Sequence, residues 1–159
     1  MVRTVTATLC FVLFTDSAAS AETKTYPLTT LEGTTNKEVV ATPVVYKGQE
    51  GLHVTVSPEH KSIQEGGCDN CTFVALDGID FANGTIEIEV AEWTSMRIDV
   101  DGEKLRLYLN GAEMAALVVA DLKLGADQHG TIGLFTESAT DAYFRNLVVT
   151  PRQAGFMAR

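Results

Sequence analysis

Two glutamates, Glu87 and Glu89, stand two positions apart in a stretch of alternating apolar and polar residues. Side chains two apart on a β-strand point to the same side and lie roughly 7 Å from each other. Glycosidases hold two carboxyl groups about 5 to 9 Å apart around the bond that they cleave. The pair is therefore a candidate acid and base for glycoside cleavage. The other interpretation is the solvated face of an amphipathic strand.

A second set of residues has the types that sugar-binding sites use. Sugar rings present apolar faces edged by hydroxyls, so flat aromatic rings and forked hydrogen-bond donors suit them. The candidates for ligand binding are Trp93, Arg97, Arg106, Tyr108, Tyr143 and Arg145. The alternative is that Trp93 and Phe144 anchor the core while the arginines solubilise the surface. Because Tyr143 and Arg145 alternate with Phe144, only one of these two sets faces inward.

Two cysteines, Cys68 and Cys71, lie in the segment Gly-Gly-Cys-Asp-Asn-Cys. In an exported protein two such cysteines are most simply a disulfide. A bridge of this span closes a very small loop and would mainly rigidify the turn. Free thiols and a metal site are the alternatives. His60 is the nearest further ligand, and the spacing fits no standard zinc finger.

The segment Asp99-Val-Asp101-Gly102 resembles the start of a calcium loop, but the rest of an EF-hand is missing. Asp77, Asp80 and Asp121 are further oxygen ligands to consider. Turn chemistry accounts for each of these acids without an ion. We therefore expect no metal and no other cofactor, with calcium as the alternative.

The first 21 residues have the features of a signal peptide. Arg3 supplies a positive charge, residues 4–14 are largely apolar, and Ala19-Ser20-Ala21 is a small-residue cleavage pattern. The apolar run is shorter than the roughly 20 residues of a membrane span. We therefore expect an exported protein, secreted or periplasmic, without a membrane span. An N-terminal strand or disordered arm is the alternative.

The remaining chain is long enough for one small domain. Its charge argues against two classes of partner, because the formal net charge is −9 and no basic stripe is present. Binding to nucleic acid or to an anionic membrane depends on such basic residues. The acidity is best explained by solubility.

Short alternating runs with turn residues between them indicate an all-β protein. Asp101-Gly102 and Asn110-Gly111 separate three such runs, and these dipeptides are strong hairpin signals. No segment has a sustained helical period, and repeated short strands without helices favour a sandwich or barrel. We predict a meander of strands over Trp93–Val100, Glu103–Leu109, Ala112–Val119, Thr131–Glu137 and Ala142–Thr150. Earlier strands are predicted at Val39–Val40, Pro43–Tyr46, Leu52–Val56, Thr72–Leu76 and Thr85–Val90.

Two-residue turns at both corners would fix the register of the hairpins. The predicted pairs are Ile98 with Leu105, Met96 with Leu107, Arg97 with Arg106, Leu107 with Met114, and Tyr108 with Glu113. Like charges directly opposite each other are destabilising. The Arg97–Arg106 pair would therefore require an anionic or polyhydroxyl counterpart, from the fold or from a ligand.

The chain resembles a known group of proteins in an ordered series of segments. These are Phe81–Val90, Trp93–Val100, Leu107–Gly111, Gly130–Phe135 and Ala142–Leu147, with Tyr46–Gly48 and Leu52–Val54 as opening strands. The series is similar to the concanavalin A-like lectin/glucanase superfamily, in particular its laminin-G-like and 3-keto-disaccharide hydrolase-type domains. The resemblance implies an antiparallel β-sandwich of jelly-roll type and a function connected with carbohydrates.

The chain departs from that group at one place. Only Ala91 and Glu92 separate two strands between which such domains usually carry several more. We therefore expect either a degenerate or internally deleted relative, in which much of the second sheet and of the concave face where ligands of the group sit is missing, or a compact variant that repacks. A shortened sandwich exposes an edge or an apolar face, which favours self-association. The glucanases of the group also carry a third acid at the position of Ala91, so that motif is incomplete.

We therefore predict an exported carbohydrate-binding or interaction module of lectin-like type, without catalysis. Its partner would be a carbohydrate or cell-surface glycan, and it could self-associate through a sheet edge. A glycoside-cleaving hydrolase or lyase with Glu87 or Glu89 as acid/base, and a vestigial structural domain, are the alternatives. The predicted organisation is a signal peptide at 1–21, an extended lead-in at 22–37, the β-sandwich at 38–151 and a C-terminal tail at 152–159.

Overall fold

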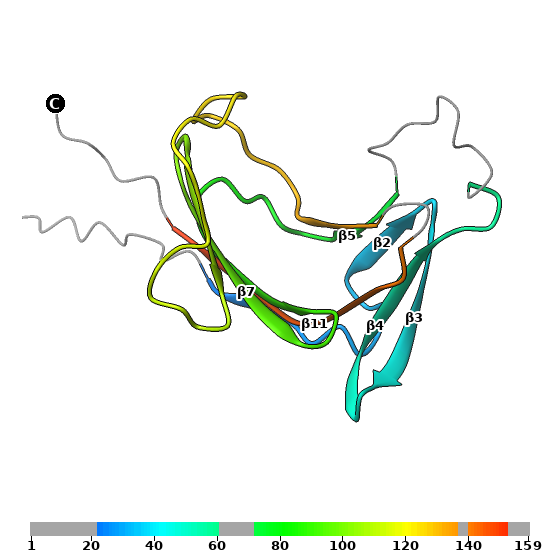
Figure 1. Ribbon diagram of the computed structural model, residues 1–159. Coiled ribbons are helices and arrows are strands. Elements are labelled where there is room, and N and C mark those ends of the chain that lie inside the picture. Colours follow the sequence, from blue (N-terminus) through cyan, green and yellow to red (C-terminus); the bar gives the residue numbers. More distant parts are fainter. Residues whose placement is uncertain (1–21, 61–71, 137–139, 153–159) are drawn as a thin grey trace, which may run out of the picture.

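The computed structural model describes residues 22–60, 72–136 and 140–152. This part of the chain contains strands and no helix, arranged as two antiparallel sheets packed face to face, which confirms the predicted β-sandwich. The eleven strands are β1 (Lys24–Tyr26), β2 (Thr34–Lys37), β3 (Val39–Tyr46), β4 (Gln49–Val56), β5 (Phe73–Leu76), β6 (Gly84–Val90), β7 (Thr94–Asp101), β8 (Lys104–Leu109), β9 (Leu117–Val119), β10 (Gly133–Phe135) and β11 (Ala142–Pro151). Figure 1 shows the larger sheet curving around the smaller one.

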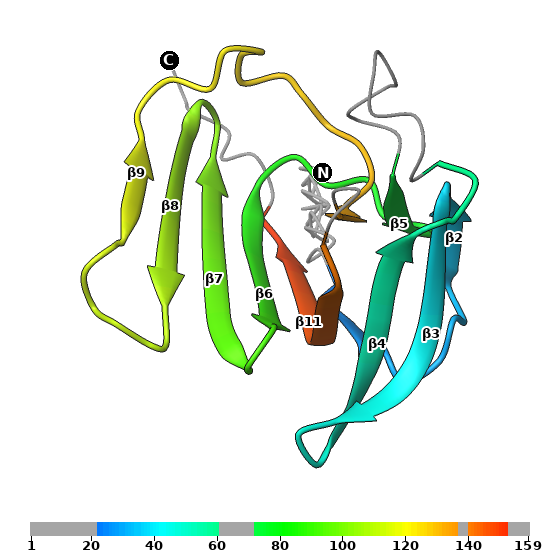
Figure 2. The same ribbon diagram turned by 45° about the vertical axis from the view of Figure 1, so that its right-hand side comes forward.

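The larger sheet has eight strands in the order β3-β4-β11-β6-β7-β8-β9, with β1 also paired to β11. The smaller sheet has the order β10-β5-β2. The predicted meander is therefore wrong beyond β9, because β10 joins the other sheet and β11 returns to the middle of the first. Figure 2 shows β11 between β4 and β6. β11 pairs with β4 on one side and with β6 on the other, and both strands lie far away along the chain. No local turn signal predicts these pairings.

The core lies between the two sheets, where alternate residues of each strand point inward. Its fully buried side chains come from β4, β5 and β11, and the largest of them are Leu52, Leu76, Leu147, Val54, Val56, Val74 and Val149. Leu134 of β10 and Ile88 of β6 complete the contact between the layers. The opposite side of the eight-stranded sheet faces away from this core.

The smaller sheet covers only part of the larger one. Leu105, Leu107 and Leu109 of β8 are partly exposed, although they share the inward face with the core residues. Leu117 and Val118 of the edge strand β9 are 50% and 61% exposed. The described part of the sandwich thus leaves an apolar region open at β8 and β9.

The first predicted corner forms one residue later than expected. Asp101 pairs with Lys104, so Gly102 and Glu103 are the central turn residues, with Gly102 at φ 58°. Glycine at the first central position is typical of a type II′ turn, whereas the prediction placed it at the second position of a type I′ turn. The register shifts by two residues, which preserves the inward face but changes every pair. Ile98 lies opposite Leu107, and Arg97 lies opposite Tyr108 rather than Arg106.

The second corner forms its turn but not the predicted hairpin. Asn110 and Gly111 have φ values of 51° and 71°, and the Ala112 amide donates to the Leu109 carbonyl at 3.0 Å. The chain then runs as a loop to β9, where Leu107 pairs with Leu117. The predicted pairs of Met114 with Leu107 and of Glu113 with Tyr108 are therefore wrong.

Two strands lie within the segment predicted as an extended lead-in. β1 pairs with β11 beside the end of β4, and β2 pairs with β5 in the smaller sheet. Leu28, between them, is 3% exposed and belongs to the core. The predicted signal peptide at 1–21, the pair Cys68 and Cys71, and residues 153–159 of the predicted tail lie outside the described residues.

Candidate functional site

Three of the six predicted ligand-binding residues meet on the outward face of the eight-stranded sheet. Trp93 and Tyr143 join Tyr46 and His53 in an aromatic cluster, and Arg145 lies against it. The Tyr143 ring is stacked between Tyr46 and His53, with centroids at 4.0 and 4.6 Å and interplanar angles of 14°. The Trp93 ring meets Tyr46 edge-on at 5.8 Å. Residues from the β3–β4 hairpin, the loop before β7 and β11 therefore form one group.

The backbone around Trp93 places its ring on the sheet. Residues 91–93 form the loop between β6 and β7, in which Glu92 and Trp93 have φ values of 60° and 62°. Positive φ is uncommon for a bulky residue and costs of the order of 1 kcal/mol or more. Gly51 of β4 provides the space, because a Cβ there would lie 3.2 Å from Trp93 Cη2 and 2.7 Å from the Phe144 carbonyl oxygen.

Arg145 connects the cluster to polar groups on the neighbouring strands. Its guanidinium carbon lies 4.8 Å from the centroid of the Trp93 ring. Its Nε donates to the Glu89 carboxylate on β6, directly opposite, and its Nη1 donates to Gln49 Oε1 at 2.6 Å. The Arg145 and Glu89 side chains are only 18% and 27% exposed. This ion pair is thus shielded from solvent more than ordinary surface pairs are.

A second ion pair joins the two hairpin tips that carry the cluster. Lys47 Nζ, in the turn between β3 and β4, lies 2.6 Å from Oε1 of Glu92, in the turn that also contains Trp93. The hydrogen bond to Glu92 raises the pKa of Lys47, and the same hydrogen bond from Lys47 lowers the pKa of Glu92. Both groups are therefore charged at neutral pH and hold the tips together.

The polar atoms of the cluster are only partly used within the described residues. His53 Nε2 lies 3.5 Å from Asp141 Oδ1, but neither His53 Nε2 nor Trp93 Nε1 has a hydrogen-bond partner in the described part of the chain, and both atoms are buried. Each buried polar atom without a hydrogen bond carries a desolvation cost of about 1–3 kcal/mol.

The other predicted binding residues lie on the same outward face, further across the sheet. The Arg97 guanidinium carbon is 4.1 Å from the centroid of the Tyr108 ring, and its Nε is 3.7 Å from Asp99 Oδ2. Arg106 lies one row away, opposite Asp99. The expected repulsion between Arg97 and Arg106 is therefore absent, because each faces a different partner.

The two candidate catalytic glutamates differ in their surroundings. Glu89 is held by Arg145, as described above, and lies opposite Ser95. Glu87 is exposed and lies between Val148 and Arg97 in the register. Both side chains are on the outward face, so the strand geometry agrees with their spacing in the sequence.

Three of the acidic residues considered for calcium are engaged in separate contacts. Asp77 accepts a hydrogen bond from Thr35 at 2.8 Å, Asp80 lies 2.7 Å from His129, and Asp99 accepts from Thr85 at 2.9 Å. No group of three or more potential metal ligands occurs among residues 22–60, 72–136 and 140–152. In the same ranges no helix is long and apolar enough to cross a membrane.

Tyr46, His53 and Gln49 were not among the residues predicted from the sequence. Gly48 is a turn signal in the sequence. In the structure Lys47 and Gly48 have φ values of 47° and 76° in a tight turn that sets Tyr46 and Gln49 opposite each other. His53 pairs with Tyr143 only because β11 lies beside β4. That neighbourhood depends on the tertiary fold and has no local signal.

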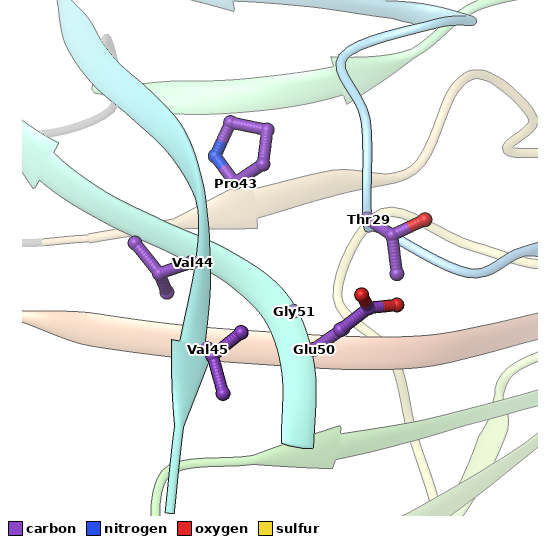
Figure 3. A pocket seen from close by; sticks show the side chains of 6 residues that line it. All are labelled: Thr29, Pro43, Val44, Val45, Glu50 and Gly51. Atoms are coloured by element: carbon purple, nitrogen blue, oxygen red, sulfur yellow. The ribbon is translucent and has the colours of Figure 1, made fainter. Parts of the chain in front are cut away.

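A small hollow lies at the hairpin of β3 and β4, and Figure 3 shows its lining side chains. It measures about 220 Å³ and is lined by Thr29, Pro43, Val44, Val45, Glu50 and Gly51. Ligand pockets usually measure about 300–1,000 Å³. Val45 is 71% exposed, so the hollow is open and holds no convergent polar groups beyond Glu50 and Thr29. The aromatic cluster is therefore the better candidate.

Comparison with known proteins supports a connection with carbohydrates. Residues 47–150 match the family of the 3-keto-alpha-glucoside-1,2-lyase-like domain. This match covers more than half of the chain, and the protein therefore belongs to that family. Neither a curated protein nor a solved structure gives a significant match. The wider likeness to the concanavalin A-like superfamily stays a prediction.

Proposed function

We propose that the protein is a carbohydrate-binding module that holds its ligand on the outward face of the eight-stranded sheet. The observation that carries this proposal is the aromatic cluster of Tyr46, His53, Trp93 and Tyr143 with Arg145 beside it. Aromatic side chains supply contact for the apolar faces of sugar rings, and the guanidinium group and tyrosine hydroxyls supply hydrogen bonds for their edges.

The position of the cluster favours a long ligand over a small one. The cluster stands on the outside of a curved sheet, and small-molecule sites are normally concave pockets that enclose the ligand. An open face instead suits a polymer that lies across it. The protein would then bind to the surface of a polysaccharide without breaking a bond in it.

Trp93 provides a direct test, because it is the only tryptophan in the chain and its fluorescence reports on the cluster. We expect retention of the protein in affinity gels that contain soluble starch, dextran or laminarin, together with a change of Trp93 emission. Tyr143→Ala should weaken retention at least tenfold, whereas Thr85→Ala, on the same face but outside the cluster, should not. Failure of all three polysaccharides to retain the protein or alter its emission would refute the proposal.

The family membership and one contact favour a second candidate, a 1,2-elimination on a 3-keto-glucoside. In such a reaction a base removes the proton on C2, which the neighbouring ketone acidifies. The C1–O bond then breaks, a C1–C2 double bond forms, and the departing oxygen takes up a proton. His53, beside Asp141 and stacked on Tyr143, has the groups for this transfer.

The two candidates separate in one experiment. The elimination requires that a 3-keto-glucoside be converted to an unsaturated product whose absorbance can be followed, and that His53→Gln abolish the conversion. In the binding proposal, the unmodified protein is retained by polysaccharide and forms no product from the 3-keto-glucoside. Glu87→Gln and Glu89→Gln test the glutamates as the acid and base in the same assay.

A further inference from the structure

The outward face carries a second group of suitable side chains beyond the aromatic cluster. The Arg97 guanidinium carbon lies 4.1 Å from the centroid of the Tyr108 ring on β8, and β8 is the fourth strand across the sheet from β4, which carries His53. Strands in a sheet are about 4.8 Å apart, so β4 and β8 are separated by about 19 Å. This separation is greater than the width of a single sugar ring.

Polar side chains fill the interval between the two groups. Arg145, Glu89 and Ser95 follow one another across β11, β6 and β7, and Glu87 and Arg97 form the adjacent row. Glu87 makes no hydrogen bond or ion pair with any residue in the described part of the chain, and Ser95 is exposed. These groups supply acceptors and donors for sugar hydroxyls at successive strands.

Each cation along this path has an acidic neighbour, although the whole chain is acidic. Arg145 and Arg97 face Glu89 and Glu87 across neighbouring strands, and Lys47 is paired with Glu92 at one end. A path of this kind neither attracts nor repels by charge, while the net charge of −9 repels anionic polymers. The complementary ligand is thus a neutral sugar chain.

We propose that the aromatic cluster and the Arg97–Tyr108 pair are the two ends of one binding track for a neutral, linear oligosaccharide of at least three rings. The chain of the ligand runs across β4, β11, β6, β7 and β8, roughly perpendicular to the strands. This inference rests on the proposed carbohydrate-binding function and adds the ligand class and the far subsite.

The test measures how the dissociation constant of the full-length protein depends on the length of the oligosaccharide. Titration of Trp93 emission with maltose, maltotriose, maltotetraose and maltohexaose, and in parallel with the corresponding laminari-oligosaccharides, gives the dissociation constant for each length. We expect the dissociation constant to fall by about tenfold between two and four rings and then level off, a difference of about 1.4 kcal/mol. Tyr108→Ala and Arg97→Gln should each remove most of this gain while leaving disaccharide affinity within twofold.

Arg106→Ala is the matched control, because Arg106 is on the same strand and face as Tyr108 but one row off the track. It should retain the full gain with length. A dissociation constant that does not depend on length, or a Tyr108→Ala variant that weakens disaccharide and tetrasaccharide equally, overturns the track while leaving the cluster as a binding site. Absence of binding to every ligand overturns both proposals, and circular dichroism of each variant identifies any loss of fold.

Discussion

Trp93 lies across Gly51, a residue 42 positions earlier in the chain, and the missing side chain of that glycine lets the indole ring approach the sheet. A Cβ at position 51 would be 3.2 Å from Trp93 Cη2, 3.3 Å from Arg145 Cβ and 2.7 Å from the Phe144 carbonyl oxygen. The carbonyl belongs to the central strand β11 and cannot move away easily. The aromatic cluster therefore depends on a residue that has no side chain of its own.

Gly51→Ala should lower the free energy of unfolding by about 1–3 kcal/mol, the usual cost of forcing atoms into a packed site. It should also shift the Trp93 emission of the folded protein. Urea unfolding followed by fluorescence and by circular dichroism measures both effects. Gly133→Ala is the control, because a Cβ there meets the Phe73 side chain at an ordinary 3.6 Å. Equal stability of the two variants would contradict the proposed close contact.

The ion pair between Lys47 and Glu92 should make the cluster sensitive to acid. The hydrogen bond from Lys47 lowers the pKa of Glu92 below its ordinary 4.5, so the contribution of Glu92 is fully present above that pH and is lost as the pH falls through the lowered pKa. The pKa of Lys47 is raised above 10.5, so its contribution is present below that value and is lost at higher pH.

A titration of Trp93 emission should therefore change at the acid end, where Glu92 takes up a proton, and at the alkaline end, where Lys47 loses one. Glu92→Gln should remove the acid step of this local transition, while Glu113→Gln, an exposed residue in the loop after β8, should retain it. A step of unchanged position and size in Glu92→Gln would assign the transition to other carboxylates. High salt should weaken the pair, because both side chains are largely exposed.

The pair of Arg145 and Glu89 should be energetically coupled. A double-mutant cycle with Arg145→Met and Glu89→Gln is expected to give a coupling free energy of about 1 kcal/mol, larger than that of most surface pairs, because both side chains are shielded by the cluster. Thermal unfolding of the four proteins measures it. Coupling near zero would show that the contact adds nothing to stability.

The observed register of β7 and β8 predicts a second coupling. Arg97 stacks on Tyr108, so the cycle Arg97→Ala with Tyr108→Ala should show a favourable coupling of about 0.5 kcal/mol. The cycle Arg97→Ala with Arg106→Ala should show a smaller coupling than a directly opposed pair, because these residues are diagonal neighbours. A repulsive coupling as large as that of a directly opposed pair in the second cycle would instead support the register expected from the Asp101-Gly102 dipeptide.

The exposed edge strand β9 should support weak self-association. Leu117 and Val118 leave about half or more of their surfaces in solvent, and an unpaired strand edge is a template for pairing with another copy. Sedimentation velocity over a range of concentrations should show association that Val118→Lys reduces. Val40→Lys, at the opposite edge with a 46% exposed side chain, is the comparison. Identical behaviour of the two variants would place the contact elsewhere.

The sequence alone determined the features that depend on near neighbours. Alternation along β6, β7 and β8 correctly predicted which side chains share a face, because successive residues of a strand point to opposite sides. Asn110 and Gly111 adopt the positive φ values that their types favour. The position of the first corner was missed by one residue, since a glycine fits either central position of a tight turn.

The tertiary structure decided what depends on distant parts of the chain. β11 enters between β4 and β6, which brings Tyr143 beside His53 and Arg145 beside Glu89. No local pattern marks this insertion, because its stabilisation comes from burying Leu147 and Val149 against residues of other strands. Side-chain type and spacing thus specify the strands and their faces, whereas long-range packing of apolar surface selects which strands are neighbours and so assembles the site.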